Sequence, residues 1–124
     1  MFVPDRIRSL ADTGETFRRP AEFDPAGYMR GAFRVMRGGR QRRVRLRFTG
    51  LAARLVPERR WHATQTIARR KDGAVDLAMT VTGLDEVAAW VMSFGGECEV
   101  VGPEELRRRV VDGHRQGSHA NRCR

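Results

Sequence analysis

The side chains best suited to bind a ligand in this sequence form a short row of arginines. Arg43, Arg45 and Arg47 alternate with apolar residues at positions 44, 46 and 48. This alternation is typical of a β-strand with one buried face, so the three guanidinium groups, called the arginine row below, would share the opposite face. Guanidinium groups bind phosphates and carboxylates through paired N–H donors. The arginine row therefore predicts a surface that binds an anionic ligand or contacts a domain of a partner subunit.

Acidic residues on neighbouring strands offer a second interpretation of the arginine row. In the fold predicted below, Asp76 would lie on one side of the row, and Glu97 and Glu99 would lie on the other. Opposite charges on adjacent strands attract one another, so these carboxylates could neutralise the row and leave no binding surface. The sequence leaves both interpretations open.

A second group of polar residues follows Trp61. Arg60, His62 and Gln65 lie close together in the chain, in a loop that leads into a strand. A histidine can act as a general base, but the sequence places no nucleophile and orienting acid with His62. We therefore predict that the chain is not an enzyme, and we interpret these three residues as candidate contacts to a ligand or a nucleic acid.

The cysteines and the remaining histidines do not form a metal-binding pattern. Cys98 lies in an apolar run, and His114, His119 and Cys123 lie in a polar tail with no second cluster of ligands. Metal sites in proteins need several such side chains at set spacings. The sequence predicts neither a metal nor another cofactor.

Positive charge is concentrated in the first part of the chain. The net charge is +9, and eleven arginines lie between Arg30 and Arg60 with Glu58 as the one acid among them. This asymmetry favours an acidic partner such as nucleic acid, although the alternative is a merely solvated surface. The chain contains no apolar run long enough to span a bilayer and no signal-peptide core near its first residue, so we expect a cytoplasmic protein with no membrane partner.

Periodicity predicts the elements that would position these side chains. The expected strands are 43–48, 64–70, 74–82 and 97–101, and the expected helices are 25–32, 50–56, 84–94 and 104–111. The order βαββαβ is that of the ferredoxin-like α+β fold, in which two helices cover one face of an antiparallel sheet and the first strand lies between the third and the fourth. The domain would cover 24–112, and the polar tail 113–124 would be disordered.

The apolar pattern also predicts the core. On the strands and the second long helix the expected buried residues are Val44, Leu46, Phe48, Leu77, Met79, Val87, Val91 and Phe94. In the helix expected at 50–56, Leu51, Ala52, Leu55 and Val56 have helical spacing. Trp90 flanks the apolar stripe of its helix, which favours core packing.

Several segments together resemble a known family. They resemble the WCX domain, which is the C-terminal extension of bacterial WYL-domain transcriptional regulators. The segments are Val44–Phe48, Arg60-Trp61-His62 with Gln65, the Asp72-Gly73 turn, Trp90–Gly95 and Val100–Arg107. The resemblance covers roughly 24–111. The run Phe2–Ser9 resembles the end of a WYL domain and Phe17–Pro20 the linker after it, so residues 1–20 are interpreted as a remnant of that domain.

The resemblance implies a ferredoxin-like domain in a regulator that has a helix-turn-helix head and a WYL domain that senses a ligand. It implies binding of nucleic-acid fragments or nucleotide-like effectors by arginine-rich surfaces, and assembly as a homodimer or with a partner chain that carries the WYL and helix-turn-helix parts. Arg6 lies where the WYL pocket places a basic ligand contact, although a solvated arginine is the alternative. The Trp-Tyr-Leu motif and a helix-turn-helix are absent from the sequence, so the chain is expected to lack the DNA-binding head.

Two classes of function compete. The first is an effector-sensing and dimerisation module of a WYL-family regulator. The alternative is a free-standing domain of ferredoxin-like topology that binds single-stranded DNA or RNA. RNA recognition motifs share this topology and stack bases on aromatic residues of the third strand, whereas residues 74–82 contain no aromatic residue. The sequence therefore favours the regulator module.

Overall fold

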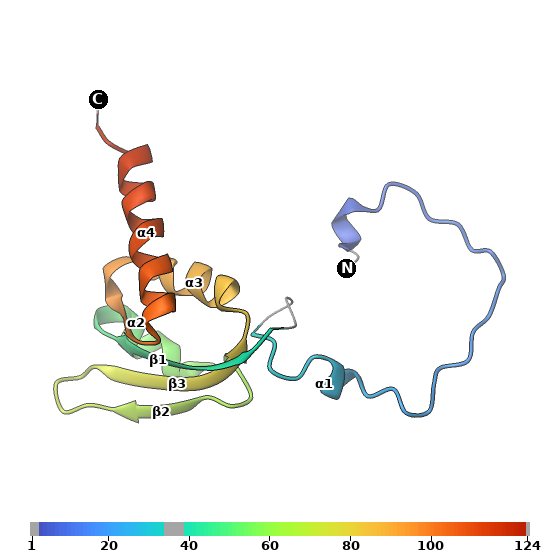
Figure 1. Cartoon of the computed structure of the whole chain (residues 1–124), viewed down its shortest axis with the longest axis horizontal. Coiled ribbons are helices and arrows are strands. Elements are labelled where there is room, and N and C mark those ends of the chain that lie inside the picture. The colour runs from blue at the N-terminus through green and yellow to red at the C-terminus, as the bar shows by residue number, and fades with distance from the viewer. Residues whose placement is uncertain (1–2, 34–38, 124) are drawn as a thin grey trace.

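Four antiparallel strands form the centre of the structure. The computed structural model describes residues 3–33 and 39–123. Strands β1 (Gln41–Phe48), β2 (Thr66–Arg69), β3 (Val75–Thr82) and β4 (Cys98–Gly102) lie in the order β2-β3-β1-β4 (Figure 1). β1 thus lies between β3 and β4, which confirms the predicted strand order and the α+β fold.

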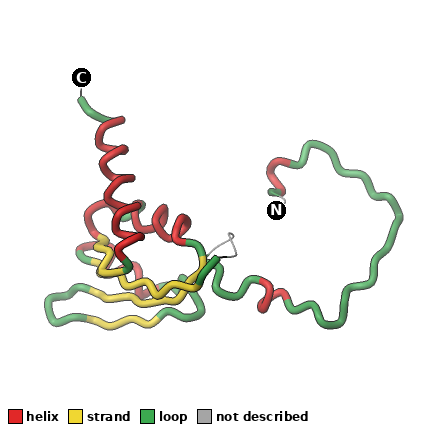
Figure 2. Tube along the Cα trace, viewed as in Figure 1, coloured by secondary structure: helices red, strands yellow, loops and turns green. Residues whose placement is uncertain are grey.

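Two long helices lie on one face of this sheet, and no described helix covers the other face. The α-helices are α1 (Pro25–Tyr28), α2 (Gly50–Leu55), α3 (Leu84–Met92) and α4 (Glu104–Ala120), and the short 3-10 helices are η1 (Pro4–Arg6), η2 (Val56–Glu58) and η3 (Gly95–Glu97). α3 and α4 lie on the same side of the strands (Figures 1 and 2). No helix among the described residues has the length and apolar character needed to cross a membrane.

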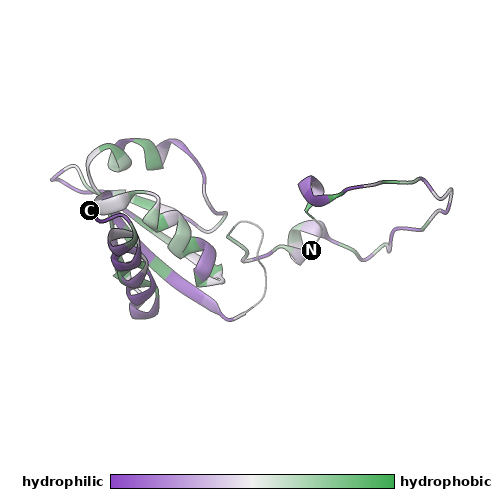
Figure 3. Cartoon of the chain, turned by 90° about the horizontal axis from the view of Figure 1, so that it is seen from above, coloured by the Kyte–Doolittle hydropathy of each residue, from purple (hydrophilic) through white to green (hydrophobic). Residues whose placement is uncertain are grey.

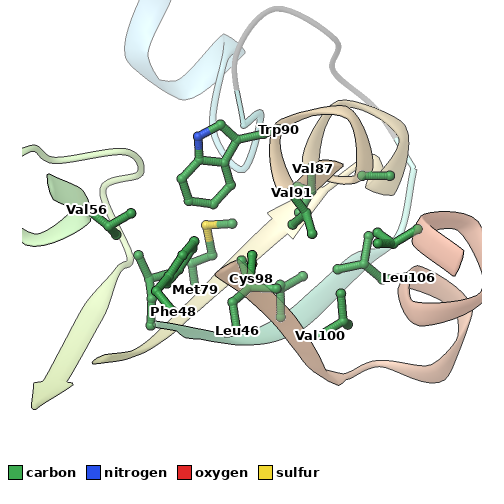
Figure 4. Close-up of a cluster of buried hydrophobic side chains, with 14 of the residues drawn as sticks. Leu46, Phe48, Val56, Met79, Val87, Trp90, Val91, Cys98, Val100 and Leu106 are labelled. Atoms are coloured by element: carbon green, nitrogen blue, oxygen red, sulfur yellow. The ribbon is translucent and has the colours of Figure 1, made fainter. Parts of the chain in front are cut away.

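Alternation in the two central strands creates the core. The inward residues of β1 and β3 are buried, as predicted, and they are Val44, Leu46, Phe48, Val75, Leu77, Met79 and Val81. Val87 and Val91 of α3 are buried above them, while Phe94 is only partly buried (Figure 4). Burial of such side chains is the main favourable term in folding.

Trp90 of α3 joins the aromatic residues of the core. It is 3% exposed, which confirms its predicted core position. Its ring centroid lies 4.9 Å from that of Trp61, 5.7 Å from that of Phe48 and 5.3 Å from that of Phe94. Trp61 donates its indole N–H to the carbonyl oxygen of Val56 at 3.0 Å, so the loop after α2 is held against the same cluster.

The rotation of α2 differs from the prediction. Of the four residues predicted at helical spacing, Ala52 and Val56 are buried, whereas Leu51 and Leu55 are 57% and 47% exposed; Ala53 is buried in their place. In so short a helix the apolar spacing fits two adjacent faces about equally well. A tertiary contact decides between them, because the carboxylate of Glu97 accepts a hydrogen bond from the Ala52 backbone N–H at 2.7 Å.

The last helix is longer than predicted. We expected it to end near Val111 and to be followed by a disordered tail, but α4 continues to Ala120. Gly113 lies inside α4, and its close packing explains why this glycine does not end the helix. A Cβ atom at 113 would overlap the sulfur of Met92, so the missing side chain lets α4 pass close to α3. Beyond this contact the helix is hydrophilic and exposed (Figure 3).

The helix in the segment before β1 is shorter than predicted. Asp24 caps α1, accepting from the backbone N–H groups of Ala26 and Gly27. The helix ends at Tyr28 rather than near residue 32, because Gly31 adopts a φ of +80° and its carbonyl accepts from Thr82 at 2.7 Å. This stretch therefore joins the sheet. Residues 3–24 are exposed, and the interpretation of 1–20 as a domain remnant stays a prediction.

Replacing Val91 or Leu46 with aspartate should abolish cooperative folding. Both side chains are fully buried, and an unpaired buried charge costs several kcal/mol, a large share of the roughly 5–15 kcal/mol by which domains are stable. Thermal unfolding followed by circular dichroism measures the effect. Ala89→Asp, on the exposed side of α3, is the matched control and should melt close to the parent. A Leu46→Asp variant that melts cooperatively near the parent temperature would show that the assigned register is wrong.

Candidate anion-binding face

The arginine row lies on the uncovered face of the sheet, called the open face below. The alternation of β1 that buries its apolar residues turns the arginines to this side. Arg43 lies opposite Thr80 of β3, and Arg45 lies opposite Ala78 of β3 and Gly102 of β4. Arg47 lies opposite a carboxylate on each side. The structure therefore brings the three predicted arginines together.

Arg47 is neutralised by Asp76 of β3. Its Nε atom lies 2.8 Å from Asp76 Oδ1, and its NH2 group lies 3.4 Å from Oδ2. Arg70 donates to the same carboxylate at 3.1 Å. The hydrogen bond from Arg47 is the main reason why the pKa of Asp76 is lowered, and the same bond raises the pKa of Arg47. The interpretation in which carboxylates neutralise the arginine row therefore holds for Arg47.

Arg43 and Arg45 differ from Arg47, because within the described residues neither guanidinium group has a hydrogen-bond or ion-pair partner. Glu97 does not flank the row, which corrects the prediction. It lies in η3, before β4 begins, and its carboxylate is bound to the N-terminus of α2. Glu99 lies opposite Arg47, so its charge favours the protonated form of that guanidinium rather than pairing with the other two.

A hollow of about 210 Å³ lies on the open face beside the row. Its lining includes Arg45, Arg47, Thr66, Ala68, Asp76, Ala78 and Val101. The alanines of β2 and β3 have side chains too short to fill the space next to the longer arginines. The volume is below the roughly 300–1,000 Å³ of sites that enclose a small molecule. It suits a phosphate or carboxylate group, or one unit of an extended chain.

No aromatic side chain of the described strands lies on the open face. The positions that share it with the arginine row are Thr66, Ala68, Asp76, Ala78, Thr80 and Glu99. The rings of the core are on the helix-covered side, where Trp90 connects them. Proteins that bind single strands through their bases stack them on aromatic residues. The open face has arginines that can contact phosphates, and its described strands offer no rings on which bases could stack.

The loop residues predicted as ligand contacts form hydrogen bonds within their own loop. Gln65 accepts from the backbone N–H groups of Trp61 at 2.6 Å and of His62 at 3.2 Å. His62 is 8% exposed, and its Nδ1 atom lies 2.8 Å from the Thr64 hydroxyl. Arg60 donates to the carbonyl of Ala63 at 2.7 Å. These bonds hold the shape of the loop, and a ligand role for Arg60, His62 and Gln65 stays a prediction.

Thr64 connects this loop to the open face. Its hydroxyl donates to the Thr80 carbonyl at 3.2 Å and accepts from the Thr80 backbone N–H at 2.9 Å. The hydroxyl thus replaces a backbone partner, which explains why β2 begins at Thr66 and not at residue 64 as predicted. Arg6 lies apart, in the exposed η1 near the beginning of the chain, and its guanidinium has no hydrogen-bond or ion-pair partner among the described residues.

Sequence reasoning missed the small residues that make the hollow. Ala68, Ala78 and Thr66 carry no chemical signature of a site, and only their cross-strand register places them beside the arginines. The available signal was the alternation of β3, which puts Asp76, Ala78 and Thr80 on the face opposite the core. Among the described residues no group of three or more His, Cys, Asp or Glu residues is placed to hold a metal ion.

Known proteins resemble this chain in fold and in sequence. Among solved structures the chain is similar to proteasome accessory factor B/C (PafBC) of Arthrobacter aurescens, with 18% sequence identity and a TM-score of 0.50. That similarity covers 86% of this chain and 16% of the other, so the chain spans a small part of that protein and the likeness concerns the fold. No curated protein matches the sequence. The profile of the WCX domain matches residues 40–117, which is more than half of the chain. The chain therefore belongs to the WCX domain family, as the resemblance of its strands and helices predicted.

Proposed function

We propose that this chain is a non-enzymatic module of a WYL-family transcriptional regulator and binds an anionic effector on the open face of its sheet. Membership of the WCX family supports the regulatory role. The single observation that carries the binding role is the pair Arg43 and Arg45, which lie on the open face without an acidic partner among the described residues. An unpaired guanidinium retains its full capacity to bind a phosphate or carboxylate.

The geometry favours an extended phosphate-containing effector, such as a fragment of single-stranded nucleic acid. Arg43 and Arg45 are two residues apart on one strand, so their Cα atoms are about 7 Å apart. Two guanidinium groups at this spacing can contact successive groups of an extended anionic chain. Arg47, held by Asp76, lies next along the row and lines the hollow with Arg45. Phosphate contacts of this kind do not read the base sequence.

A binding role is favoured over catalysis. The polar groups at the hollow are arginines, a threonine and a carboxylate that is already bonded to Arg47 and Arg70. A hydrolytic or transfer reaction needs a nucleophile beside a base, or a bound metal. We therefore assign this face to recognition. We also propose that the protein is cytoplasmic.

The alternative function is a free-standing domain that binds single-stranded DNA or RNA. The same two arginines would carry it, so both proposals predict nucleic-acid binding. They differ in what binding does, because an effector changes the assembly or conformation of a regulator. The open face of the described sheet has no aromatic residues for base stacking, and this disfavours the alternative.

Replacing both Arg43 and Arg45 with glutamine should weaken binding of a single-stranded oligonucleotide and flatten its salt dependence. Each lost phosphate contact should reduce the slope of log K against log salt by about 0.7 for a single strand. Fluorescence anisotropy at several salt concentrations gives both quantities. Arg108→Gln with Arg115→Gln, two exposed arginines of α4, removes the same charge elsewhere and should leave the slope nearly unchanged.

The variant Asp76→Asn tests the same assignment in the opposite direction. It should release Arg47 and Arg70 from their shared carboxylate, and binding should tighten.

Equal weakening of binding by the two glutamine substitutions in β1 and by the two in α4 would mean that only net charge matters. Such a result would contradict a site on the open face.

We also propose that the chain forms a homodimer, a proposal supported by the implied plan of the family. Light scattering coupled to gel filtration should give a molecular mass twice that of the chain at about 100 μM, well above the range of useful affinities. A strict monomer at that concentration would count against self-assembly. It would leave assembly with a partner chain that carries WYL and helix-turn-helix domains.

A further inference from the structure

The two edges of the sheet differ in whether another part of the chain occupies their outward hydrogen-bonding groups. At the β4 edge, Arg107 of α4 donates from Nε to the carbonyl of Val100 at 3.1 Å and from NH2 to that of Val101 at 2.9 Å. These bonds occupy acceptors that an added strand would need. The β4 edge is therefore blocked by a side chain of the helix that follows it.

The β2 edge is open. Arg70 donates its backbone N–H to Ala74 at 2.8 Å where the β2–β3 hairpin closes. Antiparallel pairs alternate between bonded and non-bonded positions, so Ala68 and Thr66 bond to β3, while Ile67 and Arg69 direct their N–H and C=O groups outward. Within the described chain these outward groups have no hydrogen-bond partner. Figure 1 shows β2 at the outer side of the sheet with nothing beside it.

Basic residues flank both ends of this edge. Arg59 and Arg60 lie at the end where β2 begins, and a hollow of about 320 Å³ there is lined by these two residues together with Pro57, Glu58, Gln65 and Ile67. A second hollow of about 410 Å³ at the other end is lined by Arg69, Arg70, Lys71 and Asp72. The two hollows thus contain five basic and two acidic side chains. Arg70 is also paired with Asp76 at 3.1 Å, and Asp72 accepts from the backbone N–H of Ala74, so the flanks of the edge keep a positive balance.

We propose that an acidic, extended segment of a partner protein pairs with β2 as a fifth strand. Main-chain hydrogen bonds to Ile67 and Arg69 would provide the pairing, and acidic side chains at both ends of the segment would meet the two basic hollows. This proposal is independent of the anion-binding function, because it uses the edge of the sheet and needs neither Arg43 nor Arg45.

The charges and hydrogen-bonding groups of the edge exclude two other occupants. A second copy of the chain pairing through its own β2 would bring the basic flanks of the two edges together, and like charges on adjacent strands are destabilising. A nucleic-acid backbone offers acceptors but lacks the alternating donors and acceptors that a strand requires. An acidic polypeptide satisfies both the charge and the hydrogen bonds.

Amide exchange resolved by NMR tests this proposal. In the free chain the amides of Ile67 and Arg69 should exchange much faster than those of Thr66 and Ala68, which bond to β3. The probe is a short synthetic peptide with glutamates at both ends of a central valine- and threonine-rich strand. Its addition should slow exchange at Ile67 and Arg69 and leave the neighbours as they were. Exchange that stays fast while the peptide is bound would overturn the proposal.

Matched variants separate the backbone bond from the charge. Arg69→Pro removes the outward N–H at a position where an edge strand tolerates proline, and Arg69→Gln keeps that N–H. The proline variant should bind the peptide roughly fivefold more weakly than the glutamine variant, the loss expected for a hydrogen bond worth about 1 kcal/mol. If the proline variant does not fold, an N-methylated peptide removes bonds from the other side and should bind correspondingly weakly.

Three further results would also overturn the proposal. One is equal binding of a peptide with lysine in place of glutamate. Another is protection of Ile67 and Arg69 that rises with the concentration of the chain itself, which would identify a second copy as the occupant. The third is protection of these amides by a single-stranded oligonucleotide. Failure of the peptide to bind, with oligonucleotide binding to the open face intact, would reject this inference and leave the proposed function standing.

Discussion

The burial of one face of β1 is the constraint on which the rest of the structure depends. Val44, Leu46 and Phe48 are fully buried in the central strand, between β3 and β4 and beneath α3. A shift of one residue in this strand would exchange these side chains for arginines in the core, so the register is strongly fixed. The same constraint gathers Arg43, Arg45 and Arg47 on the opposite face, whatever that face binds. Core packing and the candidate site are thus two consequences of one alternating pattern.

Cross-strand partners then decide what each arginine can do. Asp76 neutralises Arg47 through two hydrogen bonds, while Thr80, Ala78 and Gly102 offer no charge to the other two arginines. The open face is therefore neither fully neutralised nor uniformly basic. It has a fixed guanidinium next to two that have no partner among the described residues, beside a hollow that small residues leave open. Such an arrangement holds part of the site in place before a ligand arrives, which lowers the entropic cost of binding.

The fold was more predictable from the sequence than the site was. Alternation in β1 and β3 specifies both faces of the sheet, and turns and helix periodicity give the strand order. Contacts between segments distant in the chain could not be predicted in this way. Glu97 was expected on the open face, but it binds the N-terminus of α2 and fixes which side of that helix is buried. α4 continues through Gly113, which packs closely against Met92, and composition alone does not reveal this contact. The loop around His62 was predicted as a ligand site because its polar residues are close in sequence. The structure adds the hydrogen bonds within the loop, and the ligand role stays a prediction.

The central claim is that anions bind on the open face through arginines that have no acidic partner in the described part of the chain. Chemical-shift mapping by ¹H–¹⁵N NMR during titration with a single-stranded oligonucleotide at low ionic strength tests this claim most directly. The account predicts that the largest changes occur at Arg43, Arg45 and Ala78, with smaller changes at Thr66 on the far side of the hollow. Changes confined to the exposed end of α4 or to the loop around Arg60, or no saturable change at all, would contradict it.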